Sequence, residues 1–100
     1  MNREYEQLSV DFTTKAQALF ASTFAKFRLT TKNLDRQRDE NVFQLQVGKF
    51  VATLKQQLEN IANESMSKYQ SLKGFDHCNR MLVERINIYL NEFRQKSKLL

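Results

Sequence analysis

Large apolar residues recur every three or four positions along three long stretches of the chain, and no proline interrupts its 100 residues. The clearest stretch runs through Phe43, Val47, Phe50 or Val51, Leu54, Leu58, Ile61, Ser65, Tyr69 and Leu72. This spacing places the side chains along one face of an α-helix. Because such a face must be buried against another element, the pattern predicts an all-α fold.

The three stretches predict one domain, residues 1–100, built from three helices. We expect helices over about 3–28, 34–73 and 76–97. The short links between them predict an antiparallel three-helix bundle or helical hairpin with coiled-coil-like packing and a long second helix.

The link between the first two helices has the weakest pattern, because residues 29–41 hold few apolar side chains. Four of these residues could cap a helix start: Thr30, Thr31, Asn33 and Asp35. We place a turn at about 29–34 and the start of the second helix between Asn33 and Asp35. The alternative is an uninterrupted helix through 30–41, since no glycine or proline enforces a break.

The link between the second and third helices has clearer signals. Gly74 can adopt the left-handed conformation that ends many helices, and Phe75 can pack back on the preceding turn. Asp76 can then cap the next helix. Gly48 lies inside the predicted second helix, where glycine costs about 1 kcal/mol relative to alanine. It is either a point of close helix approach or a tolerated residue.

A second helix over 34–73 would be about 57 Å long and would extend beyond its neighbours by roughly 15–20 Å. Its apolar stripe continues over the full length, and the apolar arc of the third helix exceeds half its circumference, which predicts that another chain covers part of this surface. The candidate partner interface comprises Phe43, Val47, Leu54, Leu58, Met81 and Ile88. Val42 and Leu45, off the main stripe, are further candidates.

The chain carries a net charge of +5, and its cations are spread along the sequence. Two clusters could bind nucleic acid. They comprise Lys26, Arg28, Lys32, Arg36 and Arg38 in the first, and Arg94, Lys96 and Lys98 in the second. The alternative is a solvated surface with cations placed favourably near helix C-termini. We expect reversal of Arg36 and Arg38 to leave folding intact.

Residues that could carry catalysis are sparse. His77 is the only histidine and Cys78 the only cysteine, and neighbours on a helix should point about 100° apart. No metal-ligand spacing or phosphate-binding glycine loop is present, so we expect no enzyme, cofactor, metal or small-molecule substrate. A lone cysteine and the absence of a long apolar run favour an intracellular (cytoplasmic or nuclear) protein without a membrane span.

The composition and pattern resemble those of small helical subunits and export chaperones that function within complexes. That resemblance assigns no residue roles. The first hypothesis is a non-enzymatic protein–protein interaction module, either a subunit or an adaptor, that buries its apolar stripes against a partner or a second copy of itself. The alternative is a basic protein that binds nucleic acid through the two cationic clusters.

Overall fold

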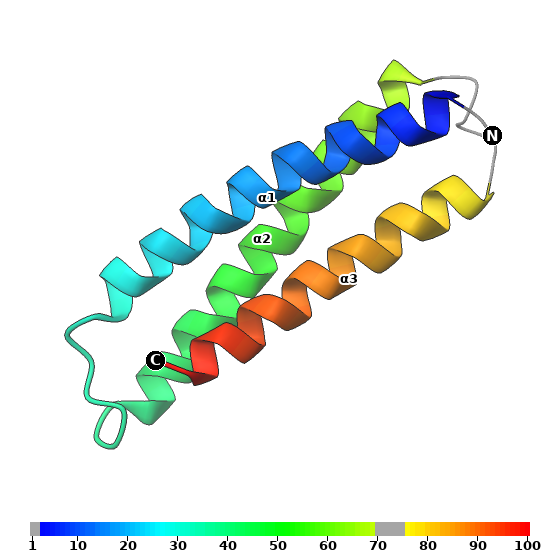
Figure 1. The fold of residues 1–100 in the computed structure, drawn as a ribbon. Helices are drawn as coiled ribbons and strands as arrows, with labels where there is room; N and C mark the ends of the chain where they lie inside the picture. Colours follow the sequence, from blue (N-terminus) through cyan, green and yellow to red (C-terminus); the bar gives the residue numbers. More distant parts are fainter. Residues whose placement is uncertain (1–2, 70–75) are drawn as a thin grey trace.

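The computed structural model describes residues 3–69 and 76–100 and contains three helices, α1 (Arg3–Thr31), α2 (Glu40–Lys68) and α3 (Asp76–Lys98). α2 runs between α1 and α3 and antiparallel to both, so that α1 and α3 point the same way (Figure 1). The principal extents are 52 × 20 × 19 Å. The described residues contain no strand, and the predicted all-α three-helix fold is confirmed.

Each helix contributes one buried row of side chains to a common core. The buried hydrophobic residues are Leu8, Phe12, Ala16, Phe20 and Phe27 in α1, Phe43, Val47, Val51, Leu54, Leu58, Ala62 and Met66 in α2, and Cys78, Leu82, Ile86, Leu90 and Phe93 in α3. Steps of four predominate among them, whereas a coiled-coil seam alternates steps of three and four. The periodicity indicates most of this core, but in the second half of α2 the stripe shifts by one residue: Ala62 and Met66 are buried, and the predicted Ile61 is only partly buried. Coiled-coil packing stays a prediction.

Aromatic rings join the three helices at the end of the bundle near the α1–α2 link. Phe27, which is fully buried, lies 5.4 Å from Phe43, 5.4 Å from Phe50 and 5.2 Å from Phe93, measured between ring centroids. The rings meet edge to face, an arrangement that adds to the stabilisation from burial alone. This cluster fixes the register of all three helices at that end.

The predicted boundaries between α1 and α2 are wrong. α1 continues to Thr31, residues 32–39 form the link, and α2 begins at Glu40 rather than between 33 and 35. The Thr31 hydroxyl is buried and donates to the carbonyl of Phe27 at 2.8 Å, so this threonine extends α1 instead of capping α2. Asp35 caps a short turn within the link by accepting hydrogen bonds from the Gln37 and Arg38 amides.

α2 is also shorter than the sequence indicates. It ends at Lys68 and has 29 residues, the same number as α1. The overhang that suggested a covering chain is therefore absent from the described residues. The expected stop at Gly74 and Phe75 lies outside them. No atom of another helix lies within 4 Å of a Cβ placed on Gly48, so the close-approach interpretation of this glycine is wrong.

Candidate docking groove and basic end

A groove runs between α1 and α3. Both helices pack mainly against α2, which lies between them (Figure 1), rather than against each other. The groove has a volume of about 650 Å³, and its lining extends from Ser9 to Phe20 on α1 and from Arg85 to Lys96 on α3. Each of these segments covers about three helical turns, or about 17 Å at 1.5 Å per residue. The groove is thus as long as a short helix.

Apolar side chains line both walls of this groove. Val10 on α1 is 57% exposed and Ile88 on α3 is 56% exposed, so both are open to solvent. Phe20 and Tyr89 lie deeper, with ring centroids 6.0 Å apart. Burial raises the pKa of the Tyr89 hydroxyl, which is consistent with its partly desolvated position. Large apolar residues exposed in a concave site mark a surface suited to binding.

Three charged residues of α3 also line the groove. The Nη1 group of Arg85 donates to the Thr13 hydroxyl at 2.6 Å and to the Ser9 carbonyl at 3.4 Å, and so bridges α3 to α1. The Lys96 ammonium lies 5.4 Å from the Phe20 ring centroid. Within residues 3–69 and 76–100, neither these two cations nor Glu92 forms an ion pair. The groove therefore presents charge of both signs without a partner of opposite charge.

The structure places most of the predicted interface residues in the protein's own core. Phe43, Val47, Leu54 and Leu58 are buried within this chain, and Met81 is partly buried against the core. No second chain is needed to cover the four α2 side chains, because α1 and α3 already do so. Of the six candidates, Ile88 alone is exposed in the groove.

The remaining groove residues were not recognisable from the sequence. Val10 lies outside the stripe that α1 buries, among polar neighbours, and a single apolar residue of this kind is common on protein surfaces. Its position opposite α3 depends on how α1 and α3 are seated on α2. Val42 and Leu45 are exposed on α2, away from the groove lining.

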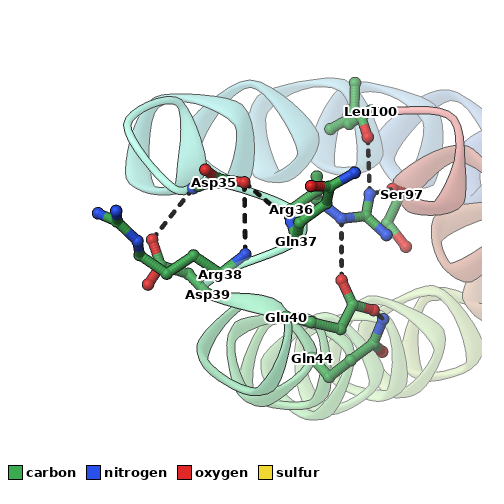
Figure 2. A network of polar contacts seen from close by, with 9 residues as sticks. All are labelled: Asp35, Arg36, Gln37, Arg38, Asp39, Glu40, Gln44, Ser97 and Leu100. Carbon is green, nitrogen blue, oxygen red and sulfur yellow. Dashed lines mark hydrogen bonds and ion pairs between the residues drawn. The ribbon is translucent and has the colours of Figure 1, made fainter.

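Arg36 connects the α1–α2 link to the C-terminal end of α3. Its Nη1 group donates to the Leu100 carbonyl at 2.6 Å and to the Ser97 carbonyl at 3.4 Å, and its Nε group donates to Glu40 at 3.1 Å (Figure 2). The guanidinium carbon also lies 3.9 Å from the Phe43 ring centroid. Hydrogen bonds from Gln44 and Arg36 lower the pKa of Glu40. Arg36 is thus a structural residue, which argues against the expectation that its reversal leaves folding intact.

This connection brings the two predicted cationic clusters to one end of the bundle. Residues 26–40 and 91–100 together contain eight Lys or Arg and four Asp or Glu, a net charge of +4 out of +5 for the chain. Apart from Arg36, the cations are exposed; they are Lys26, Arg28, Lys32, Arg38, Arg94, Lys96 and Lys98. The C-termini of α1 and α3 both lie here, and cations offset the partial negative charge of such termini.

His77 and Cys78 lie closer together than the sequence suggests. The His77 Nε2 atom is 3.6 Å from the Cys78 sulfur, so the expectation that these neighbours point apart is wrong. Burial nevertheless raises the pKa of the Cys78 thiol, which favours the unreactive protonated form. No group of three His, Cys, Asp or Glu side chains suited to a metal ion occurs in the described parts of the chain.

A second polar contact holds α1 against the end of α2. The Tyr69 hydroxyl donates to Asp11 at 2.6 Å, and the Lys68 ammonium lies 3.5 Å from the same carboxylate oxygen. The hydrogen bond from Tyr69 is the main cause of a lowered Asp11 pKa, and the same bond raises the pKa of Tyr69 to about 12. This contact lies away from the basic end.

Comparisons with known proteins identify no relative of this chain, so a functional proposal rests on the fold and the groove. No protein-family model matches the chain, and no curated protein or solved structure is significantly similar to it. Among the described residues, no helix combines the length and apolar content required to cross a lipid bilayer.

Proposed function

We propose that this protein is a non-enzymatic protein–protein interaction module, a small helical subunit or adaptor that binds a partner in the α1–α3 groove. The observation that carries the proposal is the pair of exposed apolar residues, Val10 and Ile88, on opposite walls of that groove. Water must otherwise cover both side chains, and their burial by a partner would contribute free energy of about 25 cal/mol per Å².

The shape of the groove favours a protein partner over a small molecule. It is open along its length and about three helical turns long, whereas small ligands are usually enclosed on most sides. A groove between two helices accepts the apolar face of a third element, which is a common mode of peptide recognition. The buried, protonated Cys78 and the dispersed carboxylates supply no catalytic centre in this proposal. We expect the partner to be intracellular.

Site-specific photo-crosslinking in the native cell tests this function. A photoreactive amino acid replaces Ile88 or Val10 in the groove and, as the matched control, Leu45 on α2, which is equally exposed at 58%. We expect both groove positions to give a product of the same defined mass and Leu45 to give none. Absence of a product from the groove positions, or the same product from all three, would contradict the proposal.

A second candidate function is nucleic-acid binding at the basic end. Its specific support is the contact between Arg36 and Leu100, which brings the two cationic clusters together. The exposed pair Lys32 and Arg38 can be reversed to glutamate without disturbing Arg36. If nucleic acid binds here, the DNA affinity of wild-type protein falls steeply with salt, and the double variant loses most of it. Equal affinity of the two proteins would exclude this site.

A further inference from the structure

We infer that the occupant of the α1–α3 groove is one amphipathic α-helix of a partner protein, antiparallel to α1 and α3, with acidic side chains facing Arg85 and Lys96 and a basic one facing Glu92. This inference rests on the proposed function and specifies its partner. It follows from the length of the groove, the direction of its walls and the unpaired charges along α3.

The direction of the walls favours an antiparallel helix. α1 and α3 run the same way and α2 runs against them (Figure 1). A helix antiparallel to both walls would complete an up-down-up-down four-helix bundle, in which neighbouring helix dipoles oppose each other. The groove lining covers about three turns, so the contacting part of the occupant is about 12 residues long.

Arg85 is the strongest recognition element in the groove. It is partly buried, and Thr13 and Ser9 hold its Nη1 group in place. Its Nε and Nη2 groups make no hydrogen bond within the described residues, and together they form the fork that binds a carboxylate in a bidentate manner. A guanidinium positioned in this way loses little side-chain freedom when a carboxylate binds.

The order of charged residues along α3 specifies the order of charged residues along the partner helix. Going from Arg85 to Glu92 to Lys96, the charges are positive, negative and positive. An antiparallel helix with matching charges carries an acidic residue, a basic residue four positions later and an acidic residue seven positions after that. Acidic residues eleven positions apart lie on one face after three turns, so all the contacts come from the same side of the helix.

The sequence itself argues against a second copy as the occupant. No segment of the 100 residues carries acidic, basic and acidic residues at these spacings, read in either direction. The pattern fails everywhere because no two Asp or Glu residues in the sequence are eleven positions apart. Two copies also each carry +5, which opposes their association.

Binding of two designed peptides tests the inference. The first probe is a helical peptide with leucines on one face, Glu at positions 1 and 12 and Lys at position 5; the second has these three charges reversed. Fluorescence anisotropy measures both against the full chain. We expect the first probe to bind about tenfold more tightly, because its charge pairs with the partly buried Arg85 and with the exposed Glu92 and Lys96 all become repulsive in the second.

Substitutions in the groove test whether the preference for the first peptide arises there. Arg85→Gln keeps a donor for Thr13 and should reduce the preference severalfold, as should Glu92→Gln at an exposed position. Arg80→Gln, also exposed on α3 but outside the groove lining, is the matched control and should leave the preference unchanged. Ile88→Asp should abolish binding of both probes.

The outcomes separate this inference from the proposed function. If both probes bind equally and Ile88→Asp abolishes both, the charge order is wrong while docking in the groove stands. If neither probe binds but crosslinks from Ile88 form in cells, a helical occupant is wrong and the function stands. Probe binding that is insensitive to Ile88→Asp, or self-association of the chain through the groove, also overturns the inference.

Discussion

At the scale of single residues, Arg36 caps the C-terminal end of α3 although it lies in the α1–α2 link. The last carbonyls of a helix lack partners within that helix, and here a guanidinium from the α1–α2 link binds the Ser97 and Leu100 carbonyls at the end of α3. The same group pairs with Glu40 and lies over Phe43. One residue therefore ties together parts of the link, α2 and α3.

Replacement of Arg36 by alanine should lower the free energy of unfolding by about 1–2 kcal/mol, because hydrogen bonds from a charged group and a cation–π contact are lost together. The matched control is Arg38→Ala. The backbone amide of Arg38 donates to Asp35, whereas its side chain is exposed, so this substitution should change the free energy of unfolding by less than about 0.5 kcal/mol. Urea denaturation measures both. Equal stability of the two variants would show that the Arg36 contacts contribute nothing.

The Asp11–Tyr69 contact predicts a pH effect. The folded-state pKa of Asp11 lies below its ordinary value of 3.8, so its contribution to stability is present above that value and is lost as the pH falls through the folded-state pKa. Tyr69→Phe removes the largest cause of the shift and should raise the Asp11 pKa toward 3.8. An NMR titration of the Asp11 carboxyl measures this. An unchanged pKa would show that Tyr69 is not its cause.

At the scale of elements, helix existence follows from the sequence more closely than helix boundaries do. The apolar spacing predicts each helix because burial of the stripe dominates the stability of helical segments. The sequence predicts too early a start for α2, because an aspartate such as Asp35 accepts backbone hydrogen bonds in a short turn as readily as at a helix start. Similarly, Thr31 could either cap α2 or extend α1. Its buried hydroxyl donates to the Phe27 carbonyl, and Thr31 therefore extends α1.

Gly48 lowers the stability of α2 without a compensating contact. It lies in the middle of the helix, exposed, with open space where a side chain would project. Gly48→Ala should therefore raise the free energy of unfolding by about 1 kcal/mol through helix propensity alone. Ala52→Gly, one turn later and also exposed, is the reciprocal control and should lower it by a similar amount. Thermal denaturation followed by circular dichroism compares them; destabilisation by Gly48→Ala would indicate an unseen contact.

At the scale of the whole molecule, the core is predictable and the groove is not. Each stripe identifies most of the residues that its helix buries. It does not identify which two pairs of helices pack closely and which pair leaves a groove. Which pair of helices separates depends on the large rings of Phe27, Phe43 and Phe93 and on how α1 and α3 are seated on α2. No local sequence pattern determines which pair of helices leaves a groove, so the sequence does not identify Val10 as a groove residue.

A charge introduced into the core tests the whole fold. Leu54 is fully buried at the centre of α2, so Leu54→Asp leaves a carboxylate without solvent or a partner and should cost several kcal/mol, a large part of typical domain stability. Leu45→Asp is the matched control on the same helix, at 58% exposure, and should leave the helical signal intact. Circular dichroism reads out both. Full helicity of Leu54→Asp would mean that this position is solvated.

The ring cluster around Phe27 lies toward one end of a molecule whose longest extent is 52 Å. In the described residues, the opposite end has a single aromatic pair, Tyr5 with His77, beside the Tyr69–Asp11 hydrogen bond and the neighbouring Lys68. Local stability should therefore decrease along the long axis, from the Phe27 end to the Tyr69 end. Subglobal opening should begin at the Tyr69 tip and spread toward Phe27. Amide protons near Leu8 should accordingly exchange with deuterium faster than those near Phe27, although both side chains are equally shielded from water.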